Sequence, residues 1–169
     1  AQSPRIRNFT PVTDAMLRNP SPDDWLHWRR TLDGWGYSPL DQINRENVGQ
    51  LQLVWSWALR PGSNQTTPLV SDGVMYLANP GGLVQALDAA TGDLLWEYEH
   101  EVAGSSDQGG GVGRPLRSLA IWDDKIYVNT ADAHIVALDA RTGKAVWDTT
   151  VADNTKGYTY TSGPIVVNG

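Results

Sequence analysis

The feature that most constrains the fold of this chain is an internal repeat with a period of 51 residues. Residues 86–96 read ALDAATGDLLW, and residues 137–147 read ALDARTGKAVW. Farther upstream, residues 72–77 (DGVMYL) align at the same offset with residues 123–128 (DDKIYV). Two matches at one offset indicate a repeat architecture such as an array or a propeller.

Each repeat is predicted to contain four short antiparallel strands. The predicted strands are rich in Val, Leu and Tyr and are separated by turns that contain Gly, Asp or Asn. They span residues 67–70, 74–78, 83–87 and 94–98 in the first unit, and 117–121, 125–129, 135–138 and 145–148 in the second. Four antiparallel strands per repeat are typical of a β-propeller blade, whereas leucine-rich repeats and helical solenoids have one strand or none. The sequence therefore predicts an all-β propeller.

The shared segment also predicts how neighbouring blades meet. Asp88 and Asp139 can accept backbone N–H groups in a tight turn, and Gly92 and Gly143 can adopt positive φ. The Trp four residues after each Gly begins the outer strand, so its ring can lie between adjacent blades with its N–H bonded to a backbone carbonyl. A structural role is the expected one for all of these residues.

The repeat divides the chain into an N-terminal arm and a propeller portion. The arm covers residues 1–52, with short helices expected at Thr13–Arg18, from Ser21 and at Asn44–Leu51. In the propeller portion, 53–169, we expect a strand of the closing blade at 53–59, blade one at about 66–99, blade two at about 116–150 and the start of blade three at 161–169. A propeller needs about 4–8 blades to close, so the chain is expected to be a fragment of one larger propeller domain.

Composition excludes several classes of function. The net charge of −6 argues against nucleic acid as a partner. The absence of cysteine excludes disulfides, thiol catalysis and thiolate metal sites, and the three histidines, His27, His100 and His134, are too far apart to form a metal motif. The apolar run Leu53–Leu59 is too short to span a bilayer, and no signal peptide precedes it. Either the protein is not exported or Ala1 is a mature start.

Together these residues resemble a known family. The pattern Ala-x-Asp-x-x-Thr-Gly-x-x-x-Trp is similar to the tryptophan-docking motif of the pyrroloquinoline quinone (PQQ)-dependent alcohol dehydrogenases. Residues 28–44 (WRRTLDGWGYSPLDQIN) and 47–55 (NVGQLQLVW) resemble the opening of that family. The resemblance implies an eight-bladed propeller, with PQQ and a calcium or lanthanide ion on its axis. It also implies oxidation of an alcohol or polyol, electron transfer to cytochrome c or a quinone, and a periplasmic location with the signal removed.

The resemblance implies three cofactor-binding residues in this chain. Gln65 stands where methanol and ethanol dehydrogenases have a Glu beside the cofactor, Arg117 where an Arg pairs with a PQQ carboxylate, and Thr161 where a Thr precedes the Pro of blade three. A guanidinium can hold a carboxylate with two hydrogen bonds, an amide can donate without adding negative charge, and a hydroxyl can donate or accept. The metal ligands and the catalytic Asp of the family belong to later blades, so we expect neither in this chain.

One departure from the family leaves alternatives open. Many of these enzymes have two adjacent cysteines over the cofactor, where this chain has Gly111-Val112 within a glycine-rich stretch. The departure puts the methanol and ethanol subgroup in question. A non-catalytic propeller scaffold of the bacterial envelope is the alternative function, and a separately expressed, inactive piece is a third. Arg117, Thr161 and the Trp-rich opening favour the enzyme.

Overall fold

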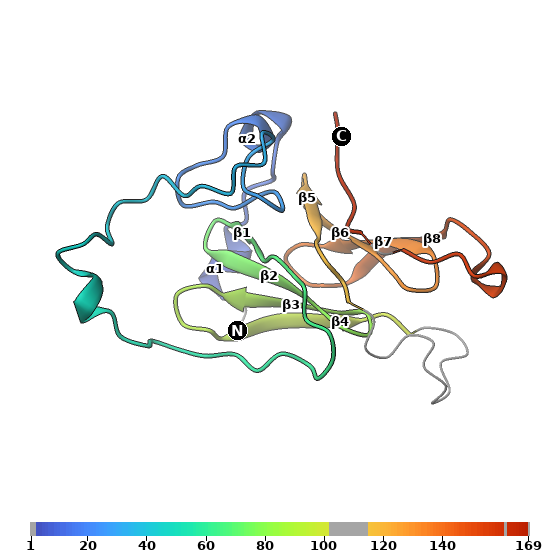
Figure 1. Ribbon diagram of the computed structural model, residues 1–169. Coiled ribbons are helices and arrows are strands. Elements are labelled where there is room, and N and C mark those ends of the chain that lie inside the picture. The colour runs from blue at the N-terminus through green and yellow to red at the C-terminus, as the bar shows by residue number, and fades with distance from the viewer. Residues whose placement is uncertain (1–2, 102–114, 161, 169) are drawn as a thin grey trace.

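A computed structural model describes residues 3–101, 115–160 and 162–168. The repeat forms two separate four-stranded antiparallel sheets, each with its strands in sequence order, which lie side by side in Figure 1. Blade one contains β1 (Leu69–Ser71), β2 (Val74–Asn79), β3 (Leu83–Asp88) and β4 (Leu94–Glu99). Blade two contains β5 (Ala120–Trp122), β6 (Lys125–Asn129), β7 (His134–Asp139) and β8 (Ala145–Thr150). The predicted blades are confirmed.

The innermost strands begin later than predicted. Strand β1 starts at Leu69 instead of Thr67, and β5 starts at Ala120 instead of Arg117. Pro68 has no N–H to donate to a ladder, and the N–H of Thr67 donates to the carbonyl of Arg117, across the boundary between the blades, at 3.2 Å. The residues that lead into the inner strands therefore join one blade to the next.

The equivalence of the two blades extends to small irregularities. The β3–β4 register shifts after Ala86, and the β7–β8 register shifts after Ala137, one repeat later. The ring of Tyr76 lies 5.9 Å from that of Trp96, and Tyr127 and Trp147 repeat this separation. The sequence repeat is thus a repeat of register and ring packing as well.

Trp96 docks blade one onto blade two. Its Nε1 donates to the carbonyl of Ala140 at 2.9 Å, and the buried Tyr76 hydroxyl donates to the same oxygen at 3.2 Å. Burial raises the pKa of Tyr76, so this hydroxyl keeps its proton. Gly143 has φ +70°, and a Cβ there would lie 2.5 Å from Cε3 of Trp96. The turn of blade two therefore needs glycine both for its backbone conformation and to let the indole approach.

Trp55 occupies the same place one blade earlier. Its Nε1 donates to the carbonyl of Ala89 at 3.2 Å, and a Cβ on Gly92 would lie 2.7 Å from its Cδ2. Ala89 and Gly92 precede Ala140 and Gly143 by one repeat. The described residues 53–59 form no backbone ladder with another strand, so they approach blade one by side chains.

Two of the predicted arm helices are wrong. Helix α2 (Asp14–Arg18) is confirmed, with Thr13 as its N-cap, and a further helix, α1 (Pro4–Arg7), precedes it. Residues 21–24 form a turn because the next residue, Trp25, pairs with Val70 of β1. Of the predicted helix Asn44–Leu51, only the 3₁₀ turn η1 (Val48–Gln50) forms, in a mostly exposed segment that bows away from the sheets in Figure 1.

The arm is fixed to both blades. Trp25 exchanges backbone hydrogen bonds with Val70 at 2.8 and 2.9 Å, and Val12 exchanges them with Asp123 at 2.9 and 2.7 Å. Side chains of the arm, among them those of Val12, Leu17 and Leu26, are buried in the core with those of both sheets. Among the described residues, no helix is long and apolar enough to cross a bilayer.

The antiparallel order places particular loops at one face. The beginnings of β1 and β5, the β2–β3 and β6–β7 turns, and the ends of β4 and β8 lie together on what we call the start face. The β1–β2, β3–β4, β5–β6 and β7–β8 turns lie on the opposite face. The docking glycines Gly92 and Gly143 therefore lie on the opposite face, and the 3₁₀ turn η2 (Asn154–Lys156) follows the end of β8.

Candidate cofactor pocket

A cavity of about 500 Å³ opens between the arm and blade two, beside β5 and the residues that lead into it. Three parts of the chain form most of its wall: the arm (Leu17 and residues 26–29, 31, 32 and 34), the segment 117–121, and residues 162–166. Gln65 also lines it. The volume lies within the range of small-molecule sites, about 300–1,000 Å³.

The structure brings together two of the three predicted cofactor residues. Gln65 and Arg117, separated by 52 positions in the sequence, line the same cavity because each leads into the inner strand of its blade. The Gln65 side chain is exposed and its amide donates to the Ser63 hydroxyl at 3.2 Å. Arg117 is half-buried, and its own carbonyl accepts the inter-blade bond from Thr67.

Thr161 lies outside the described residues, as does the pair Gly111-Val112. The residues that follow Thr161, Ser162 and Gly163, line the cavity. The carbonyl of Ser162 accepts from the Asn129 side chain at 3.2 Å, which ties this segment to the end of β6. Gly163 packs directly against Ser118, where a Cβ would clash.

The lining is mostly apolar and carries two cationic groups and a few hydrogen-bond donors. Arg29 and Arg117 contribute guanidinium groups, and the hydroxyls of Thr31, Ser118 and Ser162 can donate. Among the described residues that line the cavity, none is Asp or Glu. The Asp33 carboxylate accepts a hydrogen bond from the lining Thr31 hydroxyl but does not itself line the cavity, and the two guanidinium groups suit an anionic, carboxylated ligand.

Trp28 and Arg29 line the cavity but were not predicted as site residues from the sequence. The Arg29 guanidinium carbon lies 5.3 Å from the Trp28 ring centroid, which is a cation–π distance. Gly36, at φ +65°, curls the chain back so that its N–H donates to the Arg29 carbonyl at 3.1 Å. Trp28 and Arg29 lie in the Trp-rich opening, which resembles the PQQ family. That resemblance was the signal that could have pointed to them, although the sequence alone gave no reason to single out these two residues.

Comparison with known proteins identifies the family. Residues 25–148 match the family described as "PQQ: Glucose/ethanol/alcohol dehydrogenase, beta-propeller domain". The chain belongs to this family. The predicted relationship to PQQ-dependent dehydrogenases is therefore confirmed, and the PQQ β-propeller fold agrees with the two blades described above.

Individual PQQ-family proteins support the assignment. The chain is 46% identical over 127 residues to the dehydrogenase subunit of the quinone alcohol dehydrogenase of Gluconobacter oxydans (strain 621H), covering 75% of this chain and 17% of that protein. It is similar in structure to the quinohemoprotein alcohol dehydrogenase ADHIIG of Pseudomonas putida HK5, with a TM-score of 0.81, 39% identity, and coverage of 94% of this chain and 24% of that one. A europium-containing methanol dehydrogenase gives a TM-score of 0.77 at 35% identity over 90% of this chain and 27% of that one.

The chain spans only about a fifth of the length of these curated relatives. The described residues form two four-stranded blades of a PQQ-family propeller.

Proposed function

We propose that the full-length protein is a PQQ-dependent alcohol dehydrogenase and that this chain supplies one rim of its cofactor pocket. The observation that carries the proposal is the cavity at the start face, which brings Gln65 and Arg117 together in a wall without a described carboxylate. PQQ is a flat, tricarboxylated quinone, and a mostly apolar wall that carries two guanidinium groups and a few donors suits such an anion.

Each residue has a distinct role in this proposal. Arg117 holds one cofactor carboxylate, since a guanidinium can offer two parallel N–H donors. The Gln65 amide donates to an oxygen of the cofactor, and Thr161, which lies outside the described residues, is assigned a third cofactor contact by the resemblance alone. When bound, PQQ supplies the two-electron acceptor for oxidation of the alcohol. The residues of this chain bind and orient the cofactor, and we assign none of them a proton-transfer role.

The remaining parts of the site belong to later blades. Calcium or a lanthanide, with ligands beyond residue 169, is the expected metal. A small alcohol or polyol is the expected substrate, cytochrome c or a quinone the expected electron acceptor, and the periplasm the expected location. One relative from Thauera butanivorans is a 1-butanol dehydrogenase (cytochrome c), which supports an alcohol as substrate and cytochrome c as acceptor.

The domain boundaries follow from the same proposal. Residues 53–59 are the outer strand of the closing blade, because Trp55 contacts blade one as Trp96 contacts blade two. Residues 66–99 and 116–150 are the first two of eight blades, and the segment from 161 begins the third. A non-catalytic scaffold, the alternative function, would need the docking contacts but not a carboxylate-free cavity lined by arginine.

Reconstitution of the full-length protein tests this function. With PQQ and Ca²⁺ it should oxidise primary alcohols in a dye-linked assay and show the absorbance of bound PQQ. Arg117→Ala should raise the Kd for PQQ by about 10- to 100-fold, because one charge-assisted pair contributes roughly 1.5–3 kcal/mol.

The matched control is Arg141→Ala. This arginine lies in the β7–β8 turn on the opposite face, where it pairs with Asp139 at 2.9 Å, so PQQ affinity should not change. Unchanged affinity in Arg117→Ala would remove Arg117 from the site. Absence of both PQQ binding and activity in the wild-type protein would overturn the dehydrogenase function.

A further inference from the structure

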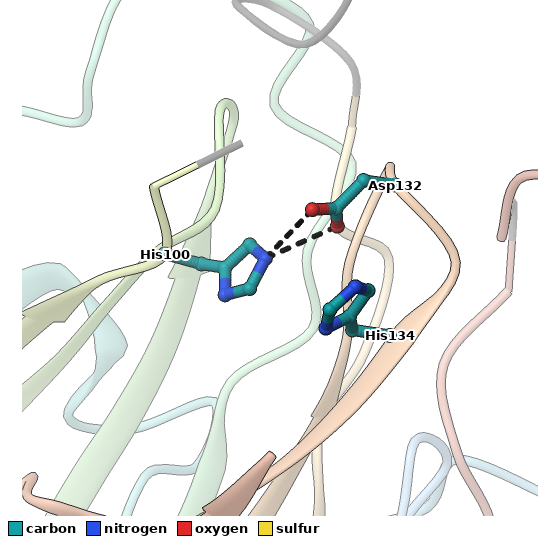
Figure 2. Close-up of side chains that lie close together, drawn as sticks. All are labelled: His100, Asp132 and His134. Atoms are coloured by element: carbon teal, nitrogen blue, oxygen red, sulfur yellow. Dashed lines mark hydrogen bonds and ion pairs between the residues drawn. The ribbon is translucent and has the colours of Figure 1, made fainter. Parts of the chain in front are cut away.

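Two histidines that are far apart in the sequence meet at the boundary between the blades. His100 directly follows β4 of blade one, whereas Asp132 lies in the β6–β7 turn of blade two and His134 begins β7. Figure 2 shows the two rings and the carboxylate facing a common space. Nε2 of His100 lies 3.0 and 3.1 Å from the two Asp132 oxygens, and one ligand atom from each of the three side chains lies within 4.8 Å of the other two.

The cluster is shielded from water. The side chains of His100 and Asp132 are 7% and 11% exposed, and that of His134 is 26% exposed. The ring centroids of the histidines are 5.4 Å apart. Asp148 of β8 adds a second carboxylate, 2.7 Å from Nδ1 of His134 and 3.9 Å from Nδ1 of His100.

The cluster places two carboxylates against two imidazoles. The Asp132 side chain is 11% exposed and that of Asp148 is 40% exposed, so it is chiefly the Asp132 carboxylate that is withdrawn from water, which is costly unless hydrogen bonds or a cation compensate. A divalent cation would supply such compensation, and imidazole binds metals through a nitrogen that carries no proton.

A second layer of hydrogen bonds orients the cluster. Nδ1 of His134 lies 2.7 Å from an Asp148 oxygen and its Nε2 lies 3.1 Å from the Thr150 hydroxyl, so a metal bound at Nε2 would take the place of Thr150. The Tyr98 hydroxyl lies 3.4 Å from Nδ1 of His100, and Thr130 Oγ1 donates to Asp132. Carboxylate and hydroxyl groups around metal-binding histidines commonly fix their tautomer and ring orientation in this way.

The backbone on both sides is fixed by the repeat. The N–H of His100 donates to the Gly82 carbonyl at 3.1 Å, and one repeat later that of Val151 donates to the Ala133 carbonyl at 2.8 Å. Each β4-type strand end is thus bonded to the turn of its own blade. The ligands themselves are not repeated, since Leu83 and Val151 stand where the other blade has His134 and His100.

We propose that His100, Asp132 and His134 form a binding site for a divalent transition metal such as Zn²⁺, which joins blade one to blade two. Two imidazoles and a carboxylate, without sulfur, suit Zn²⁺, Co²⁺ or Ni²⁺ better than Ca²⁺ or Mg²⁺. The site is separate from the cofactor pocket, because none of its residues lines that cavity, and the inference does not depend on the proposed dehydrogenase activity.

The geometry requires only a small adjustment. Ligand atoms about 2.0–2.2 Å from a tetrahedral Zn²⁺ lie roughly 3.3–3.6 Å from one another. His100 and Asp132 already approach to 3.0 Å, and the widest separation in the set is within 4.8 Å. A shift of the His134 side chain that releases Nε2 from the Thr150 hydroxyl can close this difference, and water can supply the fourth ligand.

Metal content of the full-length protein tests the site. The protein is stripped with a chelator, loaded with calcium in excess to occupy any oxygen-ligand site, and then titrated with Co²⁺ or Zn²⁺. We expect about one tightly bound equivalent, with the intense visible bands of four-coordinate Co²⁺. His134→Ala and Asp132→Asn should each lose the bands and weaken binding at least about 10-fold.

Two matched variants serve as controls. His27→Gln removes the histidine of the arm, whose Nε2 contacts the Leu17 carbonyl at 3.0 Å. Asp153→Asn removes a carboxylate that pairs with Lys156 beyond the end of β8. Neither should alter the bands or the stoichiometry.

Two results would overturn the proposal. One is a wild-type protein that binds no Co²⁺ or Zn²⁺ beyond the calcium-loaded state, and the other is binding that survives both His134→Ala and Asp132→Asn. If these variants do not fold, the melting temperature of the wild-type protein still tests the proposal. Zn²⁺ must raise that temperature, and a chelator must reverse the rise. A melting temperature indifferent to Zn²⁺ would leave the cluster as an ordinary inter-blade hydrogen-bond network.

Discussion

The carbonyl of Ala140 accepts two hydrogen bonds from blade one, and this sharing has a measurable consequence. Ala140 is 0% exposed, and its oxygen receives the Trp96 indole N–H at 2.9 Å and the Tyr76 hydroxyl at 3.2 Å. Replacing either donor residue by Phe keeps an aromatic ring but removes one hydrogen bond. In each single variant the buried carbonyl still has a partner.

The magnitudes follow from this arrangement. Tyr76→Phe should lower the free energy of unfolding by about 1 kcal/mol, the usual net value of one neutral hydrogen bond. Trp96→Phe should cost about 1 kcal/mol for its hydrogen bond plus the packing lost with the second ring, while Trp96→Ala should cost about 3–5 kcal/mol. The double variant leaves a buried carbonyl unpaired, which adds about 1–3 kcal/mol beyond the sum of the single effects.

A double-mutant cycle on the full-length protein measures that excess. Urea unfolding followed by far-ultraviolet circular dichroism gives the four free energies, provided that the m values agree among the variants. Effects of Tyr76→Phe and Trp96→Phe that add to within about 0.5 kcal/mol would refute the shared-acceptor reasoning.

Two further predictions concern the turn at the β7–β8 connection. Gly143→Ala should lower the free energy of unfolding by at least about 1–3 kcal/mol, because the new Cβ meets the Trp96 ring at a positive φ; a melting temperature equal to that of the wild type would contradict the close approach. Burial by itself would raise the pKa of Asp139, but hydrogen bonds from Arg141 and Thr142 hold it below its ordinary 3.8. This carboxylate therefore stabilises the fold above its unfolded-state pKa and ceases to do so as pH falls through the lower folded value. The difference in unfolding free energy between wild type and Asp139→Asn should accordingly narrow as pH falls from about 5 towards 3; a difference constant over that range would show that the carboxylate charge contributes nothing.

Much of the fold was predictable because the blades are encoded locally. Strands β2, β3 and β4 lie within one residue of the predicted segments, since alternating apolar residues and glycine turns mark their ends. The turn at Asp139 was likewise readable from Asp, Thr and Gly at fixed spacing.

The errors arose where contacts between distant segments decide the structure. The capping pattern at Ser21 predicted a helix, but the backbone of Trp25 pairs with β1 instead. The meeting of His100 with His134 could not be seen in sequence spacing, because it depends on which strand end abuts which turn across the blade boundary. Once the blade geometry is known, the repeat shows that the end of β4 and the β6–β7 turn lie on the same face.

Trp147 has a consequence for how such a chain is assembled during synthesis. It is 40% exposed, and every residue of β8 around it is exposed as well, whereas the equivalent Trp96 is 8% exposed on blade two. Each blade thus carries an indole that only the following blade can cover. A chain that emerges from the ribosome N-terminus first would present one such unplaced ring at a time, always on its newest blade. The indoles would then be buried in the order in which the blades are translated. At each stage the growing propeller would expose one apolar surface, on the blade that was completed last.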